Sequence, residues 1–166
     1  PSTALTEGSH ELTATVTTVA NGESAPTAIF DLTIDTSAPI KPTIDAVSDD
    51  VGTIQGPISN GGFTDDTTPT LSGKAEAGST VHLFDKGSLL GSAVVDGNGL
   101  WSFTPTTPLN SGEHSFTVTS EDKSGNVSDP SDSFGITIDT VAPTKPTIET
   151  VYDDQGDITG NLTQGQ

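Results

Sequence analysis

Aspartates recur in this sequence beside proline-containing phrases, and their residue type suggests one kind of chemistry. Residues 32–56 read LTIDTSAPIKPTIDAVSDDVGTIQG, and residues 136–160 read ITIDTVAPTKPTIETVYDDQGDITG. Carboxylates supply the hard oxygen ligands that Ca²⁺ prefers. The same side chains also accept hydrogen bonds from backbone N–H groups in turns, so turn formation is the competing interpretation.

The overall charge favours an interaction with cations. The chain has 23 acidic residues, five Lys and no Arg, which gives a formal net charge of -18. Such a surface repels nucleic acid and anionic membranes, and the sequence contains no apolar run of membrane length. Hydrophobic residues make up 30% of the chain, which predicts a small core, and there is no Cys to form a disulfide. Bound calcium is therefore a candidate stabiliser, since a metal that binds only the folded state adds folding free energy.

The aspartate-rich phrase belongs to a longer repeat. Residues 1–62 align with residues 105–166 at an offset of 104 without a gap, and 27 of the 62 pairs are identical. A fixed period of this length indicates an array of equal domains, so we expect the chain to be a segment of a longer protein. The phrases DTSAPIKP and DTVAPTKP read as linkers, because closely spaced prolines interrupt regular structure. We therefore predict the C-terminal part of one domain in 1–38, a complete domain in 39–142 and the beginning of another in 143–166.

Alternating apolar residues predict strands throughout the repeat. The runs that show this period of two are 41–47, 69–75, 80–84, 99–105, 112–120 and 132–139, and none shows a helical period. DKG (85–87) and DGNG (96–99) are typical of hairpin turns, so Asp85 and Asp96 are interpreted as turn residues. About seven strands in 104 residues predict an all-β, immunoglobulin-like β-sandwich in a tandem array, with Trp101 in its core.

Nothing in the sequence favours an enzyme. There is no Cys nucleophile, and neither GxSxG nor HExxH occurs. His10 and His114 occupy equivalent repeat positions on the inward parity of their strands, which indicates a structural role. His82 has the opposite parity to Val81 and Leu83 and is expected to be exposed.

Several phrases resemble a known family. TDDTTPTLSG, DGNGLWSFTP and TIDTVAP are similar, in this order, to the bacterial immunoglobulin-like repeats of giant type I-secreted surface adhesins and biofilm-associated proteins. The resemblance implies an extracellular rod of sandwiches on the bacterial cell surface, with calcium at the junctions. Its partners would be neighbouring repeats of the same chain, and other parts of the parent protein would contact the host cell or the biofilm matrix.

A carbohydrate- or receptor-binding module is the alternative function. Sugar recognition usually requires exposed aromatic rings, and most aromatic residues here have the inward parity of their strands. Phe63 and Phe84 are the uncertain cases, and Tyr152 lies beside a predicted junction.

Following the resemblance, we predict calcium ligands at both junctions. Ca²⁺ needs about 6–8 oxygen ligands, which several loops supply more readily than one. The predicted ligands are Asp35, Asp49 and Asp50 at the first junction, Asp122, Asn126, Asp139, Asp153 and Asp154 at the second, and Asp65 and Asp66 as additional candidates. Turn capping remains the alternative for each Asp, and Asp129 and Asp132 are interpreted as a solvated edge. Because Thr18 replaces Asp122 in the preceding repeat, the first junction is predicted to bind calcium more weakly than the second or to carry one ion fewer.

Overall fold

All regular elements in the described part of the chain are β-strands. The computed structural model describes residues 3–20, 22–153 and 160–162. No helical segment in these residues has the length and apolar character needed to span a membrane. The strands are β1 (Gly8–Leu12), β2 (Thr17–Thr18), β3 (Gly22–Glu23), β4 (Phe30–Ile34), β5 (Thr43–Asp49), β6 (Gly56–Ile58), β7 (Gly62–Thr64), β8 (Thr70–Lys74), β9 (Thr80–Asp85), β10 (Ser88–Val94), β11 (Leu100–Phe103), β12 (Gly112–Glu121), β13 (Phe134–Ile138), β14 (Val151–Asp153) and β15 (Gly160–Leu162).

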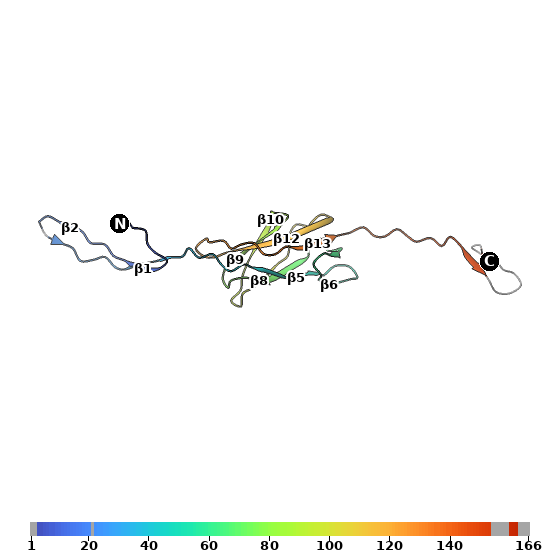
Figure 1. Ribbon diagram of the computed structural model, residues 1–166, viewed down its shortest axis with the longest axis horizontal. Coiled ribbons are helices and arrows are strands. Elements are labelled where there is room, and N and C mark those ends of the chain that lie inside the picture. Colours follow the sequence, from blue (N-terminus) through green and yellow to red (C-terminus); the bar gives the residue numbers. More distant parts are fainter. Residues whose placement is uncertain (1–2, 21, 154–159, 163–166) are drawn as a thin grey trace.

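Strands β5 to β13 form a two-sheet sandwich at the centre of an elongated molecule (Figure 1). One sheet has the order β10-β9-β12-β13-β7, and the other has the order β11-β8-β5-β6. All pairs are antiparallel except β13 with β7, which is parallel. The hairpin β1–β4 lies on one side of the sandwich and the hairpin β14–β15 on the other, each at the end of a linker.

The all-β sandwich was predicted correctly, whereas the number of strands differs from the prediction of about seven. Nine strands lie between Thr43 and Ile138. Two of the additional strands, β6 and β7, have only three residues each. They lie in the stretch GPISNGGFT, whose Gly, Pro, Ser and Asn residues read as a turn.

The core forms where the inward-facing residues of the two sheets meet. Trp101 is buried, as predicted, and Phe116, Val81 and Leu83 lie on the inward parity of their strands. The indole Nε1 of Trp101 has no hydrogen-bond partner. Burying apolar area of this kind stabilises a fold by about 25 cal/mol per Å², so a sandwich without disulfides depends on this cluster. The buried apolar residues are Val47, Ile58, Leu71, Ala75, Val81, Leu83, Val95, Trp101, Phe116, Val118, Ile136 and Ile138.

The two predicted hairpin turns are present. Lys86 and Gly87 both have positive φ, at 47° and 82°, and connect β9 to β10 as a two-residue turn. Between β10 and β11, the Asp96 Oδ1 atom accepts hydrogen bonds from the backbone N–H groups of Asn98 and Leu100. Asp96 is therefore a turn residue, as the sequence indicated.

The hairpin β1–β4 repeats the hairpin β12–β13 with the same register. Gly8 pairs with Ile34 and His10 with Leu32, as Gly112 pairs with Ile138 and His114 with Ile136. The pairing therefore follows the 104-residue offset of the sequence. The hairpin β12–β13 belongs to the five-stranded sheet, whereas β1–β4 forms a sheet of its own. Because the register is the same in both surroundings, we infer that the local sequence of each hairpin sets it.

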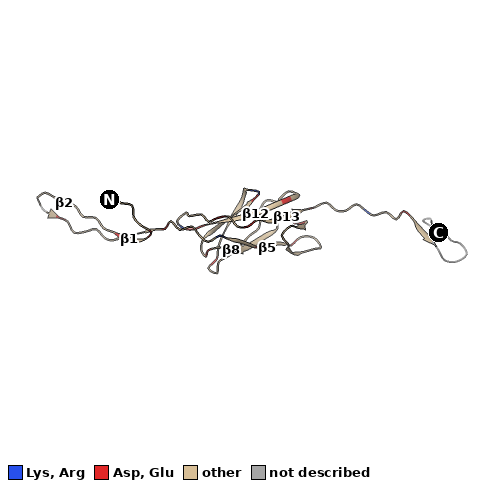
Figure 2. Cartoon of the chain, viewed as in Figure 1, with Lys and Arg blue, Asp and Glu red and all other residues tan. Residues whose placement is uncertain are grey.

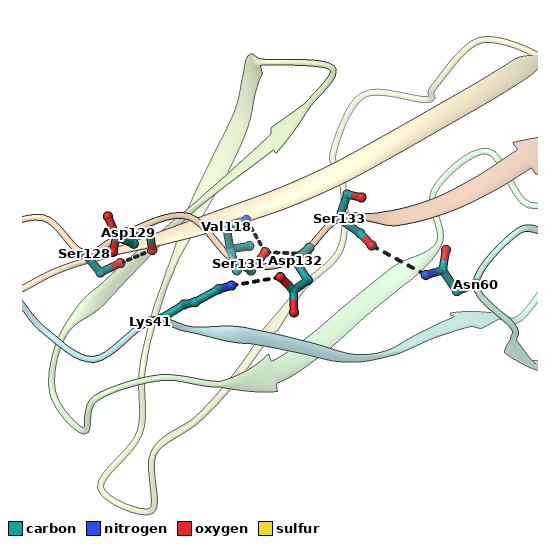
Figure 3. A network of polar contacts seen from close by, with 8 residues as sticks. All are labelled: Lys41, Asn60, Val118, Ser128, Asp129, Ser131, Asp132 and Ser133. Carbon is teal, nitrogen blue, oxygen red and sulfur yellow. Dashed lines mark hydrogen bonds and ion pairs between the residues drawn. The ribbon is translucent and has the colours of Figure 1, made fainter.

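Both hairpins contain a Ser-x-Pro-Ser/Thr segment before their second long strand, at residues 24–27 and 128–131. In each hairpin the last residue of this segment accepts a hydrogen bond from the backbone of the segment opposite. In the sandwich, the Val118 N–H group donates to Ser131 Oγ at 3.0 Å, and Ser131 Oγ donates to the Asp132 carbonyl oxygen at 2.8 Å (Figure 3). The equivalent bond in the first hairpin runs from Ala14 N–H to Thr27 Oγ1 at 3.1 Å. The hydroxyl groups thus take the place of ladder carbonyl groups in an irregular strand.

The linker before β5 is attached to this segment. The Lys41 Nζ atom lies 2.8 Å from Asp132 Oδ1, although both side chains are largely exposed (Figure 3). Asp132 is thus a solvent-facing residue, as predicted, with an ion pair of small energetic value. Pro39 and Pro42 of the same linker are buried, so the linker packs against the sandwich where β5 begins.

Candidate functional site

The predicted aspartates gather at the two opposite ends of the sandwich, but in other groups than the sequence suggested. Strand β5 leaves the first linker and is seven residues long, so it carries the chain about 23 Å away from that linker. Asp49 therefore lies at the far end, where β13 also ends and Asp139 follows. The predicted grouping of Asp49 and Asp50 with Asp35 was wrong for this reason.

At that far end, three carboxylates line one depression, which we call the C-terminal hollow. Its lining residues are Asp49, Thr53, Ile54, Phe63, Thr64, Asp65 and Asp139. The acidic residues come from three separate segments: Asp49 is the last residue of β5, Asp65 follows β7 and Asp139 follows β13. Phe63 and Ile54 are exposed apolar residues beside these carboxylates.

Hydrogen bonds fix the buried carboxylate of the C-terminal hollow. Asp49 Oδ1 accepts from the Val51 N–H group at 2.8 Å, and Asp49 Oδ2 accepts from Thr64 Oγ1 at 2.6 Å. Thr64 Oγ1 in turn accepts from the Asp66 N–H group at 3.0 Å, and the Thr64 carbonyl oxygen accepts from the Asp139 N–H group at 2.8 Å. Thr64 thus connects the ends of β5, β7 and β13.

The other two candidates of this region have contrasting surroundings. Asp65 is exposed and lies so close to Gly52 that a Cβ atom there would be 2.3 Å from Asp65 Oδ2. Asp66 is only 1% exposed; its Oδ1 accepts from the Thr68 N–H group, and its Oδ2 has no hydrogen-bond partner. A buried carboxylate oxygen normally has a partner, and a water molecule or an ion can supply it where no protein group does. Asp50 is exposed, and its backbone carbonyl oxygen accepts from the Gln55 side chain.

At the other end of the sandwich, Asp35 of the preceding segment meets the loop after β12. The Ser124 hydroxyl donates to Asp35 Oδ2 at 3.2 Å, and the Asn126 amide donates to the Asp35 carbonyl oxygen at 3.1 Å. Asp35, Glu76, Ala77, Gly78, Ser79, Asp122 and Lys123 line a depression here, which we call the N-terminal hollow. Asp122 and Asn126 therefore belong to the first junction, and their predicted grouping with Asp139 was wrong. The reason is that β12 begins at the C-terminal end and runs antiparallel to β13.

The loop after β12 is organised around Asp122. Asp122 Oδ1 accepts from the N–H groups of Ser124 and Asn126, and Oδ2 accepts from the Asn126 amide at 2.8 Å. The hydrogen bond from the Asn126 side chain is the main reason that the pKa of Asp122 is lowered from its ordinary value. The Asn126 side-chain amide thus connects Asp122 to Asp35 through its Nδ2 atom, and its role as an oxygen ligand through Oδ1 stays a prediction.

The prediction of weaker calcium binding at the first junction rested on the misplaced loop. Thr18, the repeat equivalent of Asp122, lies in β2 at the far tip of the first hairpin, away from the first linker (Figure 1). Its residue type therefore does not describe the first junction, where Asp122 itself is present. Asp153 lies in β14, and its side chain and the whole of Asp154 lie outside the described residues.

Most of these aspartates also cap turns, so the two interpretations of them are compatible. One carboxylate oxygen accepts from the N–H group two residues further along the chain in Asp35, Asp49, Asp66, Asp122 and Asp139. In the described part of the chain, no group of three or more His, Cys, Asp or Glu side chains is arranged to hold a metal ion.

The chemistry of the donors nevertheless fits a hard divalent cation. The C-terminal hollow offers carboxylate and hydroxyl oxygens and no nitrogen or sulfur ligand. Asp65 of this hollow is followed in the sequence by Asp66, whose Oδ2 atom has no hydrogen-bond partner. The donor set therefore fits calcium, provided that further oxygens come from outside the complete sandwich.

One acid–histidine pair lies outside both hollows and has a structural role. His114 Nδ1 is 2.7 Å from Asp85 Oδ2, and His114 Nε2 is 2.8 Å from the Asn110 carbonyl oxygen. The ring is stacked on Phe116, at 6.0 Å between centroids. Because a backbone carbonyl occupies Nε2, this ring has no free nitrogen with which to activate a nucleophile.

Asp85 is the residue of this pair that the sequence analysis missed. We interpreted it as a plain turn residue, but its Oδ1 also accepts from the Ser115 N–H group. The available signal was parity, since Asp85 shares the inward face of Val81 and Leu83. The other histidine of the sandwich, His82, is partly exposed and contacts Glu121 at 2.9 Å.

These features define an immunoglobulin-like β-sandwich with acidic ends. Residues 40–140 match the family model of the bacterial Ig-like domain, and the chain belongs to that family. No curated protein matches the chain. Among solved structures it is similar to the fibronectin(III)-like modules of Clostridium thermocellum CbhA, with 17% sequence identity and a TM-score of 0.47. That alignment covers 81% of this chain and 64% of the CbhA chain. The similarity thus spans less than two thirds of the length of the CbhA chain.

Proposed function

We propose that this chain is a structural spacer segment of a large extracellular bacterial adhesin. In this proposal Ca²⁺ binds between consecutive Ig-like repeats and stiffens the rod that they form, for cell adhesion or biofilm formation at the cell surface. Ig-like domains are typically structural and without catalytic activity, and those of bacteria are usually extracellular or surface-associated. Other parts of the parent protein would contact the host cell or the biofilm matrix.

The observation that carries this proposal is the distribution of acidic residues. Six of them line the two hollows, Asp49, Asp65 and Asp139 at one end of the sandwich and Asp35, Glu76 and Asp122 at the other. The neighbouring segments of the chain arrive and leave at these ends (Figure 1). At the N-terminal end, Asp35 of the preceding segment is already in contact with Ser124 and Asn126 of the sandwich. A module that only needed solubility would have no reason to concentrate carboxylates at its ends.

In this proposal, the repeat brings the two hollows of consecutive domains together as one site. Asp139 is the 104-residue equivalent of Asp35, so it would meet the equivalent of Asp122 and Glu76 in a following repeat. That arrangement would add their oxygens to those of Asp49 and Asp65. Calcium bound there would neutralise the repulsion between neighbouring carboxylates, and its removal would restore that repulsion. We therefore expect calcium removal to loosen the junction before it unfolds the sandwich.

A tandem protein made of residues 39–142 joined directly to a second copy of 39–142 tests this proposal. The segment is one 104-residue period long, so the new junction reads DTVAPIKP and retains the natural spacing. Isothermal titration calorimetry with CaCl₂ should show binding to this tandem protein and much weaker binding to a single 39–142 domain. Equal heats from the two proteins, or no heat from either, would contradict a shared site.

Matched variants of the first copy separate the junction from general acidity. Asp65→Asn and Asp139→Asn should each weaken calcium binding at least tenfold. Asp96→Asn removes the same charge from the turn between β10 and β11 and should leave binding unchanged. A similar loss in all three variants would mean that calcium responds to net charge only.

A further inference from the structure

We propose that the hairpin β1–β4 is a docking surface for a set of strands equivalent to β5–β11, supplied by a neighbouring repeat. The hairpin would then have the position in that repeat that β12–β13 has in the complete sandwich. The proposal goes beyond the proposed function, because it assigns a partner to residues 1–38 and involves no calcium ion.

One face of the hairpin is apolar and open to solvent. The 104-residue offset equates the inward residues of β12 and β13 with Leu12, Ala14, Val16, Phe30, Leu32 and Ile34. Of these, Leu12, Val16 and Phe30 are 38%, 68% and 65% exposed. The hairpin lies apart from the sandwich at the end of the first linker (Figure 2), and in the described part of the chain β1 and β4 form a sheet of their own. Because an isolated two-stranded hairpin is marginally stable in water, we expect further strands to cover this face.

The complete sandwich shows what covers the equivalent face. There, β12 pairs with β9, β13 pairs with β7, and the inward side chains belong to the common core of the two sheets. Phe116, the equivalent of Leu12, is fully buried. Leu109 is packed against the core, whereas its equivalent Leu5 is 41% exposed. The repeat therefore identifies the occupant as the strands that come before β12 in a repeat unit.

The end of β1 indicates where a neighbouring strand is needed. Strand β12 has ten residues, whereas β1 has five. Phe116 and its equivalent Leu12 are the last residues of their strands that pair with the second strand of the hairpin. Beyond this point β12 continues along β9, whereas residues 13–16 are in no strand. The missing half of β1 is thus the part that would pair with an equivalent of β9.

Backbone N–H groups of residues 13–16 are arranged for such a partner. The N–H groups of Ala14 and Val16 donate across the hairpin, as those of their equivalents in β12 do. Because successive N–H groups of an extended chain point in opposite directions, those of Thr13 and Thr15 face the open edge. Their equivalents in β12 are also threonines and lie in the ladder with β9.

The folded sandwich of a second copy does not fit as the occupant. Its β9 and β7 already pair with its own β12 and β13, so the edges that the hairpin needs are taken. Charge, in contrast, does not oppose the proposed partner. Residues 1–38 contain five acidic residues and no Lys, and residues 105–142 contain six acidic residues and one Lys, so each segment has a net charge of -5. The first hairpin therefore adds no more repulsion to a set of strands than β12–β13 does.

An extended protein, with a second copy of residues 39–104 joined to Pro1 of the full chain, tests the proposal. The new junction joins Thr104 to Pro1, as Thr104 is joined to Pro105 in the sequence. On docking, the amide hydrogens of Thr13 and Thr15 should exchange at least about tenfold more slowly than in the full chain. A chelator should not change this protection, which separates the proposal from the role of calcium.

Matched substitutions in the added copy separate docking from non-specific collapse. Val81→Asn with Leu83→Asn alters two buried residues of its β9 and should return the exchange of Thr13 and Thr15 to the rate of the full chain. Thr80→Asn with His82→Asn alters the outward parity of the same strand and should leave the protection in place. Protection that survives both pairs of substitutions, or neither, would contradict the docking geometry.

A second extended protein allows for a poor fit in the shared core. Leu12 and Ala14 are smaller than their equivalents Phe116 and Val118, so Leu12→Phe with Ala14→Val adapts the hairpin to the added copy. These substitutions should slow the exchange further. If Thr13 and Thr15 exchange in both extended proteins as fast as in the full chain, the proposal is overturned.

Discussion

The hairpins β1–β4 and β12–β13 have the same register and different surroundings. Phe116 of the second hairpin is fully buried, whereas its equivalent Leu12 is 38% exposed. Phe134 is packed against the core, and its equivalent Phe30 is 65% exposed. Both hairpins keep the same bond from a strand N–H group to a Ser or Thr hydroxyl. Local sequence therefore determines the pairing of these strands, and the remaining strands of the sandwich determine their burial.

The largest difference between the hairpins should appear on truncation of the equivalent apolar residues. Phe116→Ala should lower the free energy of unfolding of the sandwich by about 3–5 kcal/mol, since it opens a cavity in the core. Leu12→Ala should change it by less than about 0.5 kcal/mol, as expected for a substitution outside the core. Urea unfolding followed by the fluorescence of Trp101, the single Trp, reports the sandwich alone. Equal losses in the two variants would mean that both hairpins share one core.

The two repeat-equivalent histidines provide the second comparison. His114 contacts Asp85 and the Asn110 carbonyl oxygen, whereas His10 contacts, within the described part of the chain, the equivalent Thr6 carbonyl oxygen, at 2.7 Å from Nε2. His114→Ala should cost about 1.5–3 kcal/mol, because it leaves the largely buried Asp85 carboxylate with one partner fewer. His10→Ala should leave the urea midpoint of the sandwich unchanged. An unaltered midpoint for His114→Ala would show that its contact with Asp85 adds nothing to stability.

The hydroxyl bonds should differ because of burial. Ser131→Ala removes the acceptor of the buried Val118 N–H group and should cost about 1–3 kcal/mol. Thr27→Ala removes the equivalent acceptor of Ala14, which is exposed and can bond to water. Hydrogen exchange of the two N–H groups measures the effect site by site. Faster exchange should follow each substitution, but only Ser131→Ala should also reduce global stability.

The smallest expected effect is a pH response of the loop after β12. Hydrogen bonds from Asn126 and the loop backbone lower the pKa of Asp122. Because this pKa is lower in the folded state than in the unfolded state, the hydrogen bonds to the Asp122 carboxylate stabilise the loop fully when the pH is above the ordinary pKa of Asp. This stabilisation is lost as the pH falls through the lowered pKa of the folded state. The amide NMR signals of Ser124 and Asn126 should therefore shift at a pH below the ordinary pKa of an Asp side chain. Asp122→Asn should abolish this transition, and a transition that persists in Asp122→Asn would assign it to another group.

The sequence predicted the parts of the structure that depend on local pattern. Alternation placed Trp101 and Phe116 in the core, and DGNG gave the turn at Asp96, because both signals act within a few residues. The sequence analysis did not predict correctly which residues lie together when their separation along the chain differs from their separation in space. Asp49 follows Pro42, the last residue of the first linker, by only seven residues, yet an extended strand takes it to the opposite end. The length of β5 would have corrected this, since it exceeds the reach of one loop.

Two other errors arose from competing signals. The turn motif DKG concealed the inward parity of Asp85, and the Gly- and Pro-rich stretch 56–64 concealed strands β6 and β7. Glu76 and Lys123 of the N-terminal hollow were not predicted, because only the sheet order brings the loops after β8 and β12 together. The residue pattern within one segment does not indicate which loops from distant parts of the sequence lie next to each other.

Small-angle X-ray scattering of the tandem protein made of two copies of 39–142 tests the central claim most directly. If calcium joins the acidic ends of consecutive repeats, the maximum dimension should be larger and its distribution narrower in CaCl₂ than in chelator, while the sandwiches remain folded in both. A maximum dimension and distribution that do not change on chelation would contradict the account and leave these aspartates as residues that only cap turns.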